Sequence, residues 1–325
     1  MKKNIAILMG GYSSEYQISL KSGNVVYQHL SRNVYNLYRI HIFRDKWVYV
    51  DDHDEEFPVD RHDFSISPGK EKINFDGVFI AIHGSPGEDG YLQAYLDLLN
   101  IPHTSCGFYQ AALTFNKRDC LSVLKAYDIP CATSFYLNKG DEISTSDIVA
   151  RVGMPCFVKA NKAGSSFGVS KVHREEDLMQ AIEYSFKEDD EIIIESFLDG
   201  TEVSVGVIRY RGETTVLPIT EIVSENDFFD YNAKYMGQSQ EITPARLPDE
   251  MTAKVSEIAK KVYEILKLSG FSRSEYIIVN DVPHLLEINT IPGMTAESIL
   301  PQQAGVAGIS LGDLFDNAVA EALKK

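Results

Sequence analysis

A lysine followed by a short segment rich in glycine and serine is the first candidate for chemistry. Lys159 ends an apolar run, and Gly164, Ser165, Ser166 and Gly168 follow in close order. Glycine lets backbone N–H groups approach phosphate oxygens, serine hydroxyls add donors, and a lysine supplies positive charge. The chain contains no GxxxxGK[ST] segment, so this is not a Walker A loop. The pattern indicates either a phosphate-binding loop or a glycine-rich hairpin turn beside a solvated lysine.

Two other segments place carboxylates and an arginine at alternate positions of predicted strands. Arg273 and Glu275 are two residues apart, as are Glu287 and Asn289. Because successive side chains of a strand point to opposite faces, the members of each pair share a face. If the two strands pair, they bring together oxygen ligands of the kind that hold Mg²⁺ beside a phosphate. A polar sheet face with cross-strand ion pairs is the alternative interpretation.

Three turns or loops complete the candidates. His83 follows an apolar run and precedes a glycine-rich turn, which is the mouth of an α/β sheet if a helix follows, although a plain tight turn fits equally well. Glu15 follows Gly10 and Gly11 at the start of a helix, where it complements the helix dipole or holds a substrate ammonium. The polar loop 227–243 is long enough to be a lid over a site, or else a surface loop.

The apolar pattern predicts the elements that position these residues. Strands at 5–9 and 77–82, each followed by a glycine turn and a helix, predict an α/β region over the first ~105 residues. The acidic segment 51–63 is expected to be a surface loop or an edge hairpin.

The rest of the chain predicts a smaller α+β unit and then a second strand-rich region. For the unit we expect helices at 110–127 and 175–186, and strands at 157–158, 169–172 and 191–195. For the region that follows we expect strands at 202–208, 216–223, 276–279 and 284–288, a long helix that begins at 248, and a closing helix at 311–323.

Composition excludes several classes of protein. The chain has 325 residues, of which 44% are hydrophobic and 24% charged, as in a folded protein of about two or three domains. The net charge of −16 disfavours binding of nucleic acid or an anionic membrane through bulk charge. Four cysteines without CxxC spacing indicate free thiols in a reducing compartment, and no apolar run is long enough to span a membrane. We therefore expect a cytoplasmic protein with neither nucleic acid nor a membrane as its partner.

Taken in order, these segments resemble the D-alanine–D-alanine ligases of the ATP-grasp superfamily. The resemblance covers nearly the whole chain and rests on segments 9–20, 83–90, 101–104, 157–171, 233–235 and 287–295, together with Lys117, Glu195 and Glu202. It implies an α/β and α+β fold with a three-domain ATP-grasp architecture. The implied domains are a Rossmann-like α/β domain over 1–106, a central subdomain with the glycine-rich loop over 107–200, and a C-terminal domain with metal ligands and lid over 201–325.

The resemblance also implies the reaction. Two D-alanines would be joined by ATP through a D-alanyl phosphate, with release of ADP and phosphate, for peptidoglycan precursor synthesis. ATP, two Mg²⁺ ions, which Mn²⁺ can replace, and a homodimer are expected. A ligase that uses D-lactate or D-serine is an alternative that Tyr235 disfavours, because the family keeps this tyrosine where D-alanine is the nucleophile. A catalytically inactive ATP-binding paralogue is a second alternative. It is favoured only by Glu275, at a position where the family usually has Asp.

Roles for individual residues follow from the same resemblance. The residues expected to contact ATP are Lys117, Lys159, Ser166, Glu195 and Glu202. Those with expected catalytic roles are Glu15, Ser165, Lys234, Tyr235 and Arg273. The D-alanine substrates would contact His83, Gly293 and Ser298. Mg²⁺ would be bound by Glu275, Glu287 and Asn289, and the extra methylene of Glu275 relative to Asp lengthens its reach toward the metal.

Overall fold

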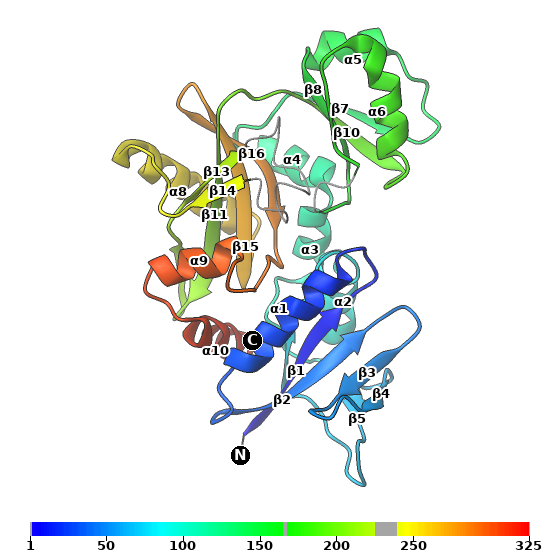
Figure 1. Cartoon of the computed structure of the whole chain (residues 1–325), viewed down its shortest axis with the longest axis vertical. Coiled ribbons are helices and arrows are strands. Elements are labelled where there is room, and N and C mark those ends of the chain that lie inside the picture. Colours follow the sequence, from blue (N-terminus) through cyan, green and yellow to red (C-terminus); the bar gives the residue numbers. More distant parts are fainter. Residues whose placement is uncertain (1, 165–167, 225–238, 325) are drawn as a thin grey trace.

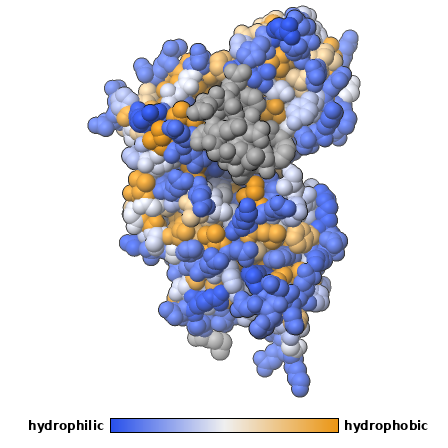
Figure 2. Space-filling model, viewed as in Figure 1, coloured by the Kyte–Doolittle hydropathy of each residue, from blue (hydrophilic) through white to orange (hydrophobic). Residues whose placement is uncertain are grey.

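The computed structural model describes residues 2–164, 168–224 and 239–324. Within these residues the strands form three sheets, and helices lie against each of them (Figure 1). No helix among them is long and apolar enough to cross a membrane. Hydrophilic residues dominate the face of the molecule drawn in Figure 2, as the charged fraction of the sequence predicts.

The first sheet has the strand order β5-β4-β3-β2-β1-β6. Its strands are β1 (Lys3–Gly10), β2 (Tyr35–Ile42), β3 (Trp47–Val50), β4 (Glu56–Asp60), β5 (Ser65–Ile66) and β6 (Gly77–Ile80). β1 pairs in parallel with both β2 and β6. Ile5 and Ile7 belong to one buried cluster and Ala6 and Leu8 to another, so β1 is covered on both faces. This explains its continuous apolar run.

The predicted strands at 5–9 and 77–82 are therefore confirmed. The helices that follow them are α1 (Tyr16–His29) and α2 (Tyr91–Leu98). The acidic segment 51–63 contains β4, which pairs antiparallel with β3 and with β5 at the sheet edge. The hairpin alternative is the correct one for this segment. β2 and β3 were not predicted; buried residues alternate irregularly along β2 but regularly along β3, which has only four residues.

The second sheet forms the lobe drawn in green at the upper right of Figure 1. Its strands, in sheet order, are β7 (Ser134–Asn138), β10 (Glu191–Ser196), β8 (Cys156–Ala160) and β9 (Ser170–Val172). Two helices, α5 (Thr145–Val152) and α6 (Leu178–Ser185), pack against it, and a 3₁₀ turn (Glu175–Asp177) precedes α6. The strands expected at 157–158, 169–172 and 191–195 correspond to β8, β9 and β10, and the helix expected at 175–186 is this turn plus α6.

The third sheet has the order β14-β13-β11-β15-β16, and β12 pairs with β11. Its strands are β11 (Thr201–Tyr210), β12 (Glu213–Val216), β13 (Thr220–Ser224), β14 (Ser239–Ile242), β15 (Phe271–Val279) and β16 (Val282–Asn289). Its helices are α8 (Asp249–Ile265), α9 (Ile299–Val306) and α10 (Leu311–Ala322). The single strand expected at 216–223 is wrong: Pro218 lies between β12 and β13, and proline has no N–H to continue a ladder.

The helix expected at 110–127 is also interrupted. It is two helices, α3 (Phe108–Phe115) and α4 (Lys117–Lys125), which meet at Asn116. Asn116 has an extended backbone, and its side chain accepts a hydrogen bond from the N–H of Asp119 as the N-cap of α4. Asparagine favours such caps over helix interiors because its side chain competes for backbone groups. The apolar pattern continues across the break and therefore hides it.

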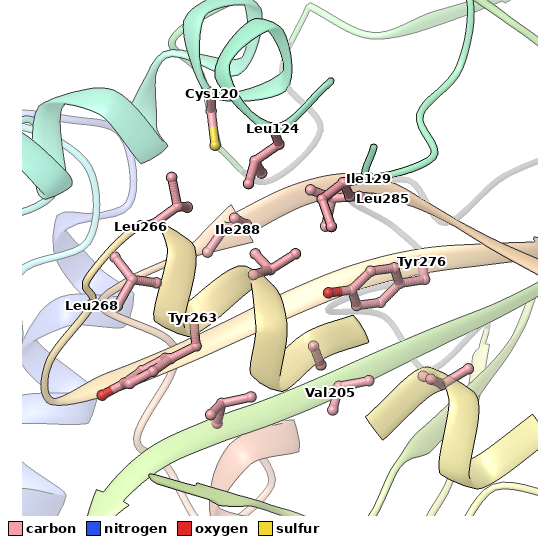
Figure 3. Close-up of a cluster of buried hydrophobic side chains, with 14 of the residues drawn as sticks. Cys120, Leu124, Ile129, Val205, Tyr263, Leu266, Leu268, Tyr276, Leu285 and Ile288 are labelled. Carbon is pink, nitrogen blue, oxygen red and sulfur yellow. The ribbon is translucent and has the colours of Figure 1, made fainter. Parts of the chain in front are cut away.

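The two helices α3 and α4 pack with the third sheet. Cys120 and Leu124 of α4 share a buried cluster with Tyr276 of β15 and Val205 of β11 (Figure 3). The residues of the second sheet form a different cluster. The three domain ranges 1–106, 107–200 and 201–325 stay a prediction. α3 and α4 fall in the second range but pack with the third sheet, so this packing concerns the start of the second domain.

Candidate active site

The carboxylate of Glu15 lies where the first sheet meets the glycine-rich segment. A Cβ atom placed on Gly164 would be 2.8 Å from Glu15 Oε2, and one on Gly84 would be 3.3 Å from the same oxygen. Glycine at both positions lets two backbone segments approach this carboxylate closely. The start of α1, the turn after β6 and the loop after β8 therefore converge on Glu15.

A pocket beside Glu15 joins four segments that are far apart in the sequence. Its walls include Glu88, Lys117, Gly164, Glu287 and Asn289. The Lys117 ammonium donates a hydrogen bond of 2.8 Å to the Ala163 carbonyl and lies 3.2 Å from Glu287 Oε2. The first residue of α4 thus contacts both the glycine-rich segment and β16.

The second lysine lies on β8, opposite carboxylates. Lys159 Nζ is 2.9 Å from Oε2 of Glu195, which lies on the neighbouring strand β10. Burial alone would lower the pKa of Lys159, but the charges of Glu195, Glu287 and Glu202 outweigh this and raise it. The side chain is therefore a charged ammonium, which is suited to bind phosphate. Lys159 thus lies close enough to interact with Glu195 and Glu202, the two carboxylates that are predicted to contact ATP.

The predicted pairing of the two carboxylate-bearing strands is confirmed. In the β15–β16 ladder Arg273 is opposite Asn289 and Glu275 is opposite Glu287. Arg273 donates a hydrogen bond of 2.8 Å to Glu275, whose side chain is 7% exposed. A guanidinium, two carboxylates and a carboxamide therefore occupy neighbouring positions of one sheet, as the spacing predicted.

The donor set fits a divalent cation that is shared with a phosphate. Within the described ranges, no three His, Cys, Asp or Glu side chains gather closely enough to hold a metal alone. Glu275 and Glu287 are nevertheless cross-strand neighbours, and the side-chain nitrogen of Asn289 is buried without a hydrogen-bond partner among the described residues. Rotation of this carboxamide would offer its oxygen instead. Mg²⁺ commonly takes one or two carboxylates and completes its shell with water and phosphate oxygens.

His83 uses both ring nitrogens within the protein. Nδ1 lies 2.8 Å from the Ile291 carbonyl, which can only accept, so Nδ1 carries the proton. Nε2 lies 3.0 Å from the Ser22 hydroxyl, and Ser22 Oγ accepts from the N–H of Met294. Burial lowers the pKa of His83, in keeping with a neutral ring. His83 thus ties α1 and the turn after β6 to the segment after β16.

Ser22→Ala is expected to lower the free energy of unfolding by about 1 to 2 kcal/mol, because it leaves a buried ring nitrogen and a buried N–H unpaired. Urea unfolding followed by circular dichroism measures this change. Ser146→Ala, which removes an exposed hydroxyl on α5, is the control. Equal stability of the Ser22→Ala and Ser146→Ala variants would show that the contacts of Ser22 contribute nothing.

Gly293 and Ser298 lie in one turn after β16. A Cβ on Gly293 would be 2.6 Å from the Ser298 hydroxyl, so a larger residue here would require the Ser298 side chain to move. The same hydroxyl lies 2.9 Å from Thr295 Oγ1, and α9 begins at Ile299, directly after Ser298. The hydroxyl also accepts a hydrogen bond of 3.2 Å from the N–H of Thr295, so the turn holds Ser298 in place close to Gly293. Four other predicted residues, Ser165, Ser166, Lys234 and Tyr235, lie outside the described residues.

Two carboxyl groups near the site were not assigned a role from the sequence. Glu88 lies in the pocket wall, and its Oε2 accepts a hydrogen bond of 2.7 Å from the N–H of Gly84. Burial, together with the charge of Glu15, raises the pKa of Glu88 to about 8. Burial also raises the pKa of Glu241 on β14, where Arg273 and Glu275 are its charged neighbours. The glycine-rich turn could have drawn attention to Glu88, whereas no sequence signal marks Glu241.

The raised pKa of Glu88 predicts a pH dependence of stability. The folded protein holds this proton more tightly than the unfolded chain, whose glutamate has a pKa near 4.5. Stability from Glu88 is therefore complete below about pH 4.5 and is lost as pH rises to about 8. Glu88→Gln should flatten this part of the profile, as measured by urea unfolding at several pH values. Glu183→Gln, at an exposed position of α6, is the control, and identical profiles for all three proteins would contradict the prediction.

The fold has three sheets, and two lysines, a carboxylate pair and an arginine converge between them. This arrangement defines the class of ATP-grasp ligases, and the solved structures agree. The chain has a TM-score of 0.88 with the VanG D-Ala:D-Ser ligase of Enterococcus faecalis, at 30% identity over 98% of this chain and 99% of that one. It has a TM-score of 0.89 with D-alanyl-alanine synthetase A of Vibrio cholerae, at 28% identity over 100% and 99% of the two chains.

The chain belongs to the D-alanine–D-alanine ligase family. The family models for the N-terminus and C-terminus of D-Ala D-Ala ligase match residues 4–106 and 123–320. A protein of Flavobacterium johnsoniae called D-alanine–D-alanine ligase is 69% identical over 98% of both chains. One of the same name from Christiangramia forsetii is 57% identical over the full length of both. The resemblance seen in the sequence and the expected fold class are thereby confirmed.

Proposed function

We propose that this chain joins two D-alanine molecules into D-alanyl-D-alanine, using ATP and releasing ADP and phosphate. Family membership over nearly the whole chain supports this function. The observation that carries it in the site is the contact of Lys117 with Glu287. The contact joins α4 to β16, and it supports a phosphate-binding role for Lys117 and a metal-binding role for Glu287.

The first half of the reaction activates a carboxylate, which is a poor acyl donor. The carboxylate of the first D-alanine attacks the γ-phosphorus of ATP, the bond to the β,γ-bridging oxygen breaks, and ADP leaves. Lys117 and Lys159 would hold the phosphates and offset their charge, while Glu195 and Glu202 would face the adenosine. Glu15 would hold the ammonium of the first D-alanine, since its carboxylate lies against the glycine-rich segment.

In the second half the amine of the other D-alanine attacks the acyl carbon. The bond to the phosphate oxygen breaks, phosphate leaves, and the nitrogen loses a proton. Arg273 and the N–H of Gly293 would stabilise negative charge on the carbonyl oxygen. Ser298 would bind the carboxylate of this second substrate. Ser165, Ser166, Lys234 and Tyr235 keep the roles that the family resemblance implies, and water must be excluded because acyl phosphates hydrolyse.

Glu275, Glu287 and Asn289 would hold Mg²⁺. When bound, the ion would neutralise phosphate charge and orient the γ-phosphoryl group. We further propose a cytoplasmic homodimer that serves peptidoglycan precursor synthesis. Family membership supports each of these points. The measured mass in solution tests the dimer, and the dependence of rate on added Mg²⁺ tests the ion.

Phosphate release with identification of the product by mass tests the function. The protein is incubated with ATP, Mg²⁺ and either D-alanine, L-alanine, D-alanine with D-lactate, or D-alanine with D-serine. Phosphate release with D-alanine alone, together with the dipeptide mass, is the expected result. A preference for the mixed product with D-serine or D-lactate would replace the proposed second substrate. ATP binding without turnover in any mixture would overturn the proposal in favour of an idle paralogue.

A further inference from the structure

A fully buried carboxamide lies between the two lysines assigned to ATP. Asn161 has no exposed surface and follows Lys159 by two residues, at the point where β8 ends and the glycine-rich segment begins. Its backbone carbonyl lies 3.4 Å from the N–H of Lys117, which donates to it. Asn161 is therefore adjacent to both lysines, to one through the chain and to the other through space.

The side chain of Asn161 is held on both its nitrogen and its oxygen. Nδ2 donates hydrogen bonds of 2.8 Å to Asn116 Oδ1 and of 2.8 Å to Glu191 Oε2. Oδ1 accepts a hydrogen bond of 2.9 Å from the N–H of Arg118. Both amide protons and the carbonyl oxygen thus have partners, which fixes the orientation of the carboxamide.

These partners belong to two differently packed parts of the molecule. Asn116 caps α4, which packs in the cluster of the third sheet. Glu191 lies on β10, in the second sheet, whose buried residues form their own cluster. Arg118 strengthens the same junction, because its guanidinium donates to Asn138 Oδ1 on β7. The carboxamide therefore connects the two bodies at the place from which Lys117 and Lys159 arise.

We propose that Asn161 is a positioning residue for ATP, which sets the separation of Lys117 and Lys159. The inference rests on the proposed function only in taking both lysines as phosphate ligands. A tight clamp on phosphates needs two cations at a fixed distance, and these two come from separately packed bodies. Hydrogen bonds supply the constraint because they are directional, whereas apolar packing at this junction would allow sliding.

Asn161→Ala removes three side-chain hydrogen bonds and keeps the backbone. We expect the KM for ATP to rise about tenfold, while the KM for D-alanine stays within about twofold. A variant that merely folds poorly would show a lower kcat from fewer active molecules, with both KM values unchanged. Asn36→Ala is the control with the same substitution, because it removes a single side-chain hydrogen bond at an exposed position of β2.

Asn161→Asp tests the polarity of the same contacts. The carboxylate can still accept from the Arg118 N–H, but it cannot donate, and it stands beside the carboxylate of Glu191. We expect at least the tenfold rise in KM for ATP seen with alanine. Adding Glu191→Gln supplies an amide donor to the new carboxylate and should recover most of the loss. This recovery would not occur if Asn161 only filled space.

Calorimetry of the binding of a non-hydrolysable ATP analogue with Mg²⁺, in the absence of D-alanine, separates this inference from the proposed function. Weaker binding to both single variants, with recovery in the double variant, supports the positioning role even if the wild type makes no dipeptide. Unchanged analogue affinity in folded Asn161→Ala protein overturns it, whatever the turnover. If Asn161→Ala does not fold, the test is the comparison of Asn161→Asp with the double variant. Equal affinities of these two proteins for the ATP analogue overturn the proposal.

Discussion

Lys159→Ala is expected to lower kcat/KM for ATP-dependent phosphate release about a thousandfold. Lys159 is mostly buried and lies 2.9 Å from Glu195, with Glu287 and Glu202 acting on its charge. ATP would bring further negative charge into this group of carboxylates. Without the ammonium, nothing at this position of β8 offsets the repulsion, and phosphate binding weakens most in the transition state.

Two controls separate this effect from a loss of folding. Lys139→Ala likewise breaks a lysine–carboxylate pair in the second-sheet lobe, that of Lys139 with Asp190, but both side chains are exposed, so activity should be retained. Lys159→Ala leaves Glu195 buried without its cation, which destabilises the fold by roughly 3 kcal/mol. Lys159→Arg keeps the charge and should fold like the wild type while losing part of the activity. Wild-type rates for folded Lys159→Ala protein would rule out the proposed role.

Glu287→Gln is expected to lower kcat at saturating ATP about a hundredfold and to raise the Mg²⁺ concentration needed for half-maximal rate. The substitution keeps the size of the side chain but removes its charge. Glu287 faces Glu275 across the β15–β16 ladder and lies 3.2 Å from Lys117. In the proposed site, both the binding of Mg²⁺ and the placement of Lys117 would depend on that charge.

Phosphate release measured over a series of Mg²⁺ concentrations tests this prediction. Glu264→Gln, at an exposed position of α8, is the control and should behave as the wild type. If Glu287→Gln lowers the rate without changing the Mg²⁺ requirement, Glu287 acts through Lys117 and not as a metal ligand. An unchanged rate would remove Glu287 from the proposed site altogether.

Several parts of the site could be predicted because they depend on local geometry. The shared face of Arg273 and Glu275, and of Glu287 and Asn289, follows from the alternation of side chains along any strand. The buried parallel strand β1 followed from its continuous apolar run, and the ordered motifs identified the family. These inferences needed only the residue order, since the backbone repeats are the same in every protein.

Other parts could not be predicted, because they depend on how separate bodies pack. The break at Asn116 was hidden by an apolar pattern that runs across it, and the strand break at Pro218 was missed although proline is visible in the sequence. The raised pKa of Glu88 arises from burial and from Glu15, a residue on another element. No spacing rule connects such residues.

The sequence by itself determined the family, the fold class and the chemical types of the candidate site, because these depend on residue identity and on local backbone repeats. Tertiary structure alone decided which groups meet. Lys117 contacts Glu287, His83 joins Ser22 to the Ile291 carbonyl, and Asn161 ties α4 to the second sheet. These partners come from different elements, and their distances are set by the packing of sheets and helices, which no local periodicity encodes.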